Sequence, residues 1–199
     1  MIFSATKSKV ANRGRPPDEF LTKLLAWGRA ADAEIFAPRP APKGRPDLDV
    51  YAFIVSVLGP WESMLHRRAA LIETMLVHAG LESSWNQHEG KDPGNHNPDP
   101  KSWETGLFQV SFDSTEIDHN AMLPFAVEHG IGTYGSFISL MKTDINLAFE
   151  YYARLVRVSV WWAGPFRRRE VQDWLSRPAM KEWMGLLVTP EPFADRDTK

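Results

Sequence analysis

No cysteine occurs among the 199 residues of the chain. A chain without thiols forms neither disulfides nor thiolate zinc sites, and peptidase or amidase mechanisms that depend on a Cys–His pair are excluded. The absence does not indicate a compartment, because a thiol-free protein tolerates oxidising and reducing surroundings alike.

Long apolar runs are also missing. The longest candidate, residues 50–58, stops at Gly59-Pro60 and falls well short of the ~18 apolar residues that a membrane helix needs. The net charge is −2 and the isoelectric point is near 6.3, so the chain carries no basic field suited to nucleic acid. We expect neither a membrane nor a nucleic acid as a partner.

The first residues of the chain do not resemble a secretion signal. Residues 1–15 contain basic side chains but no apolar core of signal-peptide length. We therefore expect a protein that is made in the cytoplasm without a general export signal. Hydrophobic residues make up 43% of the chain and charged residues 24%, which is typical of a globular protein.

Two proline-rich stretches divide the N-terminal part of the chain. Residues 1–17 are polar and basic and end in Pro16-Pro17, so we expect them to be poorly ordered. Asp18 is expected to cap a helix whose apolar residues lie between 20 and 27. Prolines recur throughout residues 38–47 and predict a stiff linker there.

The composition after this linker predicts a mainly α-helical domain. We expect an N-terminal segment, residues 1–46, followed by a catalytic domain, residues 47–199. Residues 86–105 are rich in Gly, Pro, Asn and Asp and predict a long loop, and residues 106–113 predict a small extended or β-like turn region. Apolar spacing of three and four predicts helices in five segments: 49–58, 61–84, 122–128, 137–162 with one break, and 168–187.

One carboxylate stands out at the end of the longest apolar helix. Glu82 follows Leu81 and precedes Trp85 by about one helical turn. Burial among apolar and aromatic side chains can keep a proton on such a carboxyl group, as a general acid requires. The plainer interpretation of Glu82 is a surface helix residue. A compact turn, Gly106-Leu107-Phe108-Gln109, begins 106 − 82 = 24 residues later.

The pair Glu82-Ser83 followed by this turn resembles the goose-type lysozymes and lytic transglycosylases of the lysozyme-like superfamily. Those enzymes carry a Glu-Ser pair and a Gly-Leu-Met-Gln segment, with Phe108 here in place of Met. Trp161-Trp162-Ala163-Gly164-Pro165 resembles their Tyr-Asn-Ala-Gly-Pro segment, although Trp161 and Trp162 both depart from it.

This resemblance implies a lysozyme-like fold and a peptidoglycan glycosidase that cleaves the β-1,4 bond between N-acetylmuramic acid and N-acetylglucosamine. Glu82 would be the general acid. Together with the missing export signal, it suggests an antibacterial effector of the type VI secretion kind, acting in the periplasm and paired with an immunity protein that occupies the groove. A phage endolysin, a lytic transglycosylase, a chitinase and a non-catalytic glycan-binding module of the same fold are the alternatives.

The resemblance also assigns groove residues. A second catalytic carboxylate would be Glu104 or Asp113, which rank above Asp99, and each is otherwise a solvated loop acid. Core packing is the plainer interpretation for most of the aromatic residues. The substrate-binding candidates are Ser83, Trp85, Trp103, Gly106, Phe108, Gln109, Ser111 and Trp162.

The loop before the turn is rich in oxygen ligands. Asp92, Asn95, Asn97 and Asp99 carry the hard oxygen donors that Ca2+ prefers. Their spacing fits no EF-hand, and Asn/Asp-rich loops are common without a metal. We therefore expect no cofactor, with calcium as the weaker alternative.

Overall fold

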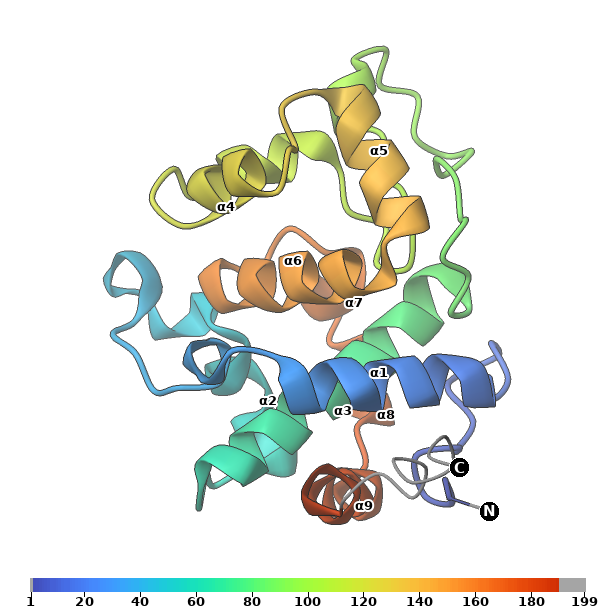
Figure 1. Cartoon of the computed structure of the whole chain (residues 1–199), viewed down its shortest axis with the longest axis vertical. Helices are drawn as coiled ribbons and strands as arrows, with labels where there is room; N and C mark the ends of the chain where they lie inside the picture. The colour runs from blue at the N-terminus through green and yellow to red at the C-terminus, as the bar shows by residue number, and fades with distance from the viewer. Residues whose placement is uncertain (1, 190–199) are drawn as a thin grey trace, which may run out of the picture.

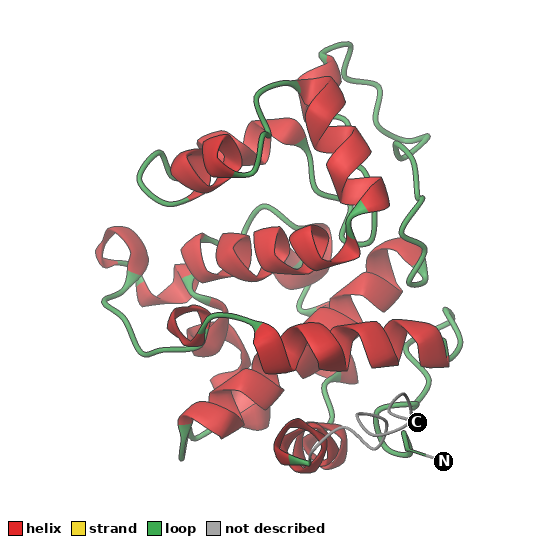
Figure 2. Ribbon diagram, viewed as in Figure 1, coloured by secondary structure: helices red, strands yellow, loops and turns green. Residues whose placement is uncertain are grey.

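The structure is a computed structural model that describes residues 2–189. It is mainly helical, with 59% helix and nine α-helices in the described part (Figure 2). Over the same residues the extended structure is an isolated bridge between Thr105 and Val110. The predicted mainly-α class is confirmed, and the lysozyme-like topology stays a prediction.

The helices follow one another along the whole described chain. The α-helices are α1 Asp18–Ala30, α2 Val50–Leu58, α3 Met64–Ser83, α4 Met122–Glu128, α5 Tyr134–Thr143, α6 Ile145–Val158, α7 Gly164–Arg167, α8 Glu170–Trp174 and α9 Arg177–Val188. Short 3-10 helices are η1 Ala33–Ile35, η2 Pro42–Gly44, η3 Pro46–Leu48, η4 Pro100–Ser102 and η5 Phe112–Glu116.

Helix α3 forms the centre of the core. It contacts α1, α2, α6, α8 and α9, and most of its residues are buried, so it has no solvent-facing side of the usual width. Along the long axis of the molecule, α4 and α5 lie at one end and α9 at the other, with α6 between them (Figure 1). Several helices therefore pack around α3 and fix its position in the core.

Polar side chains set the ends of the main helices. Ser63 begins α3 by accepting a hydrogen bond from the His66 N–H at 3.1 Å, and Asp144 begins α6 by accepting from Leu147 at 3.0 Å. The break predicted within residues 137–162 falls at Asp144. The single helix predicted over 168–187 is wrong, because Ser176 caps a separate α9 whose first turn contains Pro178.

The N-terminal segment is packed rather than poorly ordered, contrary to the expectation from its composition. Phe3 and Val10 are buried in the same hydrophobic cluster as α3, and α1 packs on α3, α6 and α9. The cap of α1 is Pro17, and Asp18 is already its first helical residue. The proline-rich stretch forms η2 and η3, and the residues before it share the core with those after it.

Within residues 2–189, no helix combines the length and the apolar character that crossing a bilayer requires. The end of the predicted catalytic domain, residues 190–199, lies outside the described residues.

Glu73 is an acid buried between α3 and α9. Its Oε1 accepts a hydrogen bond from the Ser176 N–H at 3.2 Å, and its Oε2 accepts one from Trp183 Nε1 at 3.1 Å. Burial raises the pKa of Glu73 to about 8, although both hydrogen bonds act in the opposite direction. The folded protein therefore holds a proton on Glu73 at neutral pH that the unfolded chain releases.

We predict that the free energy of unfolding falls as the pH rises from about 5 to about 8, because the unfolded chain loses its Glu73 proton near pH 4.3 and the folded chain only near 8. The variant Glu73→Gln carries no ionisable group there and should lose much of this slope. Thermal melting of both proteins across that range tests the prediction. Parallel pH dependences of wild type and variant would contradict it.

Candidate functional site

The two residues that follow helix α3 have left-handed backbone conformation. Ser84 has φ 54° and Trp85 has φ 62°, which is unusual for a bulky side chain. Trp85 folds back onto α3, where its Nε1–H donates to the Leu76 carbonyl at 2.9 Å and its ring packs on Gly80. A Cβ at Gly80 would lie 2.6 Å from that ring. Trp85 therefore lies in the core and closes the helix, rather than lining a groove.

The turn that follows the long loop is closed by two backbone hydrogen bonds. Thr105 N–H donates to the Val110 carbonyl at 2.9 Å, and Val110 N–H donates back to Thr105 at 3.3 Å. Gly106 has φ 71°, and a Cβ there would lie 3.1 Å from the Met141 carbonyl oxygen. The backbone conformation and the close approach of Met141 therefore favour glycine at this position of the turn.

Ser83 joins this turn to the end of α3. Its hydroxyl donates to the Leu107 carbonyl at 2.8 Å, in buried surroundings. Phe108 points into the core, where it stacks on Tyr152 with ring centroids 3.8 Å apart. Of the turn residues, Gln109 is the one whose side chain reaches the neighbouring cavity. Ser83, Gly106 and Phe108 thus position the turn.

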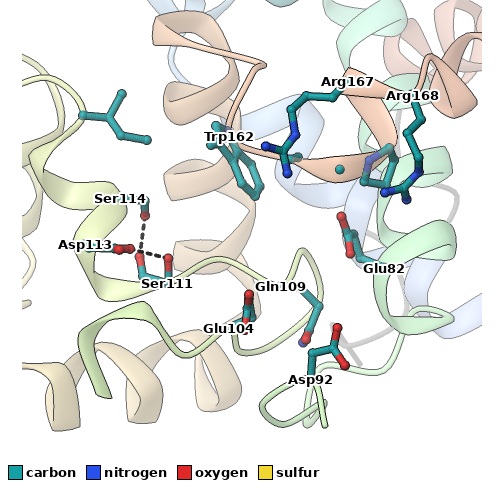
Figure 3. A pocket seen from close by; sticks show the side chains of 14 residues that line it. Glu82, Asp92, Glu104, Gln109, Ser111, Asp113, Ser114, Trp162, Arg167 and Arg168 are labelled. Atoms are coloured by element: carbon teal, nitrogen blue, oxygen red, sulfur yellow. Dashed lines mark hydrogen bonds between the residues drawn. The ribbon is translucent and has the colours of Figure 1, made fainter. Parts of the chain in front are cut away.

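A cavity of about 510 Å³ opens between this turn and the segment after α6 (Figure 3). Four carboxylates line it, and two guanidinium groups, Arg167 and Arg168, come from the other side. Its lining includes Glu82, Asp92, Glu104, Gln109, Ser111, Asp113, Ser114, Trp162, Gly164, Pro165, Arg167 and Arg168.

A second cavity of about 670 Å³ adjoins the first one. Both are lined by Glu82, Asp92, Gln109, Pro165 and Arg168, so the two cavities adjoin at these residues and are treated as the two halves of one groove. Glu82 lies where the halves meet. We call this two-part cavity the groove.

The surroundings of Glu82 are aromatic on one side. Its side chain is 20% exposed, and its Oε1 lies 3.2 Å from Nε2 of the fully buried His78, one turn earlier on α3. The two groups approach closely without the alignment of a regular hydrogen bond. Burial raises the pKa of Tyr152 well above its usual value, and the charge of Glu82 raises it further. Glu82 and Tyr152 are therefore electrostatically coupled.

Several buried polar atoms beside Glu82 make no hydrogen bond to any residue in the range 2–189. His78 lies among the rings of Phe108, Tyr152, Trp162 and Phe166. Neither of its nitrogens makes a hydrogen bond to a described residue, and the same is true of Tyr152 Oη and Trp162 Nε1. Groups of this kind usually pair with water or a ligand. The spacing of four between His78 and Glu82 is the signal by which the sequence could have revealed His78.

The structure brings two of the three predicted second carboxylates to the groove. Glu104 lines it, with Oε2 accepting from Asn95 Nδ2 at 2.7 Å, and Asp113 lines it while accepting from the Ser111 hydroxyl. Asp99 lies outside, where it caps η4 by accepting from the Lys101 N–H at 3.0 Å. Asp92, which the sequence indicates as a possible calcium ligand, lines both halves.

The Asn/Asp-rich loop is stabilised by turns between side chain and backbone. Each of the four candidate calcium ligands accepts a hydrogen bond from the N–H two residues later, at 94, 97, 99 and 101 respectively. This pattern explains the loop composition without an ion. Over residues 2–189, no three His, Cys, Asp or Glu side chains are grouped in a way that could hold a metal.

Two of the predicted tryptophans have different surroundings. Trp103 belongs to the packing of the loop, with Nε1–H donating to Asn97 at 2.9 Å and with Tyr134 and Lys91 against its ring. Trp162, another of the substrate-binding candidates, lines the groove.

Arg167 and Arg168 line the groove. Arg168 Nε donates to Glu170 at 2.7 Å. This hydrogen bond, with the charges of Glu170 and Glu82, raises the pKa of Arg168 and outweighs its desolvation. A Cβ at Gly164 would lie 2.7 Å from Arg168 Nη1, so Gly164 leaves room for the guanidinium near Glu82.

The comparisons with known proteins identify no relative. No protein-family model matches the chain, and no curated protein or solved structure matches it.

We predict different effects on stability from substituting two neighbouring tyrosines. Tyr151 Oη makes a 2.5 Å hydrogen bond with the Ser114 hydroxyl, whereas Tyr152 Oη is buried without a hydrogen-bond partner among the described residues. Tyr151→Phe should lower the free energy of unfolding by about 1 kcal/mol or more. Tyr152→Phe should leave it unchanged or raise it, because no protein hydrogen bond is lost. Denaturant titration of the two variants measures this, and equal destabilisation would contradict the prediction.

Proposed function

We propose that the protein is a glycosidase that cleaves the β-1,4 bond between N-acetylmuramic acid and N-acetylglucosamine in peptidoglycan, with Glu82 as the general acid. The observation that carries the proposal is that Glu82 lines both adjoining halves of an open groove. A polymer that is cut internally needs such a groove, because sugar units must be held on either side of the broken bond.

The lining suits a sugar chain. Carboxylates and an amide offer acceptors and donors for hydroxyl and acetamido groups, and the face of Trp162 offers an aromatic surface. Arg167 and Arg168 supply positive charge beside Glu82, which suits the carboxylate of an adjacent peptide stem. These features support a polar, polymeric substrate over a small apolar ligand.

The reaction follows from a proton donor at this position. Glu82 would give its proton to the glycosidic oxygen while the bond to the anomeric carbon breaks, leaving an oxocarbenium-like centre. Asp92, Glu104 or Asp113 would then take a proton from a water that attacks this carbon. In the alternative lytic reaction, the 6-hydroxyl of the same sugar attacks instead and its proton passes to Glu82, which gives a 1,6-anhydro product.

We further propose that this activity serves as an antibacterial, cell-wall-degrading effector that acts in the periplasm of a target cell. Six carboxylates and three guanidinium groups line the two halves of the groove. An immunity protein that occupies this acidic groove would therefore present basic or amide side chains to Glu82.

We predict that Glu82→Gln abolishes the clearing of purified peptidoglycan while the protein stays folded, because the amide keeps the shape of the side chain and cannot donate the proton. The matched control is Glu116→Gln, an exposed carboxylate outside both cavities. It should clear peptidoglycan as the wild type does.

The same pair of variants tests the proposed place of action. When exported to the periplasm of a Gram-negative host, the wild type and Glu116→Gln should cause lysis and Glu82→Gln should not. A folded Glu82→Gln protein that clears peptidoglycan at the wild-type rate would refute the role of Glu82.

The identity of a catalytic base can be tested by three substitutions at the groove, Asp92→Asn, Glu104→Gln and Asp113→Asn. If a base activates water, one of them should lower the rate on the order of 10²-fold or more. Asp99→Asn is the control, since Asp99 lies outside both cavities. If all three stay within a few-fold of wild type, mass spectrometry should find 1,6-anhydro ends. If all three variants stay active and the products carry hydrolytic ends, then neither a base at one of these three residues nor the anhydro-forming reaction is correct.

A further inference from the structure

The first residues of the chain are held in place by a carboxylate far away in sequence. Glu182 of α9 accepts hydrogen bonds from the Ser4 N–H at 2.8 Å, and from the N–H and the hydroxyl of Thr6 at 2.7 Å each. Phe3 packs on Trp183 of the same helix, with ring centroids 5.9 Å apart. Hydrogen bonds to a charged acceptor are stronger than neutral ones, so this anchor is firm.

The anchored segment continues into a tight loop. Val10 N–H donates to the Gly14 carbonyl at 2.9 Å, and Arg13 N–H donates back to the Val10 carbonyl at 2.9 Å. Ala11 and Gly14 have φ values of 46° and 89°, which close the turn. Val10 is buried at the base of the loop, and Asn12 and Arg13 are exposed at its tip.

The tip of this loop lies at the groove. Ala11, Asn12 and Arg13 line the second half together with Glu82 and Trp174. This half also contains Glu89, Asp92 and Glu170, so its acids outnumber its two guanidinium groups, Arg13 and Arg168.

The chemistry of this half favours a neutral sugar unit over a strongly anionic ligand. The excess of carboxylates repels polyanions, whereas carboxylates accept hydrogen bonds from hydroxyl groups. Trp174 ends α8 with 40% of its surface exposed, although a ring of this kind is usually buried more deeply. An exposed indole beside hydroxyl-binding groups matches the flat apolar face of a sugar ring.

We propose that residues 2–17 form one wall of the groove. Asn12, Arg13 and Trp174 then bind an N-acetylated hexosamine unit next to the bond that is cleaved at Glu82. This inference rests on the proposed function and names which part of the chain holds the polymer. The segment is then a substrate-binding element of the groove.

The test uses the full chain and insoluble peptidoglycan sacculi. The variants are Asn12→Ala/Arg13→Ala and Trp174→Ala. Lys9→Ala, an exposed cation of the same segment, and Trp161→Ala, an indole 36% exposed, are matched controls that do not line the groove. Binding to sacculi is measured by co-sedimentation of proteins that also carry Glu82→Gln, so that the sacculi are not cleaved. Cleavage kinetics are measured with Glu82 intact. The melting temperature is measured for every protein.

We expect the two groove variants to bind sacculi on the order of tenfold more weakly and to show a correspondingly higher KM with kcat unchanged, since they lose only substrate binding. The controls should behave as the unsubstituted protein, and all melting temperatures should stay close together. Groove variants that bind and cleave like the controls would overturn the proposed wall while leaving the glycosidase intact.

The remaining outcomes separate this inference from the proposed function. The wild type could cleave no peptidoglycan and yet bind sacculi in a manner that depends on Asn12, Arg13 and Trp174. That result would support the proposed binding wall and refute the glycosidase. If the protein neither binds nor cleaves sacculi, both proposals are refuted.

Discussion

The buried hydrogen bond from the Ser83 hydroxyl to the Leu107 carbonyl, 2.8 Å long, is the contact on which the geometry of the groove depends. It fixes the turn of residues 105–110 to the last turn of α3. Because residues 69–80 of α3 are buried by the surrounding helices, Glu82 in its last turn is where the C-terminal part of the helix reaches solvent. The Glu82 side chain is 20% exposed there, and Gln109 lines the same groove. A general acid needs this combination of fixed position and access to substrate.

Sequence patterns predicted the features that depend on local chemistry. The apolar spacing of residues 61–84 predicted α3, and Ser63 and Asp144 begin helices as capping residues do. Glu82 and the turn that contains Gln109 were singled out together, and the structure brings both side chains to one groove with Glu104, Ser111, Asp113 and Trp162. Local signals succeed at these places because the cap, the turn and the helix face are each formed by neighbours in the chain.

The remaining features depend on partners that are distant in sequence. Nothing near Phe3, Thr6 or Val10 indicates that they are buried, because Thr6 finds Glu182 on α9 at a separation of 176 residues. Sequence patterns predicted Trp85 and Phe108 as groove residues, but both side chains are buried in the core. Large aromatic rings stabilise the folded protein most when they are fully enclosed. The same enclosure leaves polar atoms of His78, Tyr152 and Trp162 without a hydrogen bond to a described residue. The spacing of four links His78 to Glu82 in the sequence, whereas Tyr152 and Trp162 come near His78 only through packing.

The central claim is that a glycan lies along the groove with its scissile bond at Glu82. The most direct measurement is the structure of the Glu82→Gln protein with a soluble peptidoglycan oligosaccharide bound. We expect sugar rings in both halves of the groove, with the amide at position 82 within about 2.6–3.2 Å of a glycosidic oxygen. We also expect a ring against Trp174, beside the loop tip at Asn12 and Arg13. A saccharide bound away from residue 82, or confined to one half with no glycosidic oxygen near the amide, would contradict the claim.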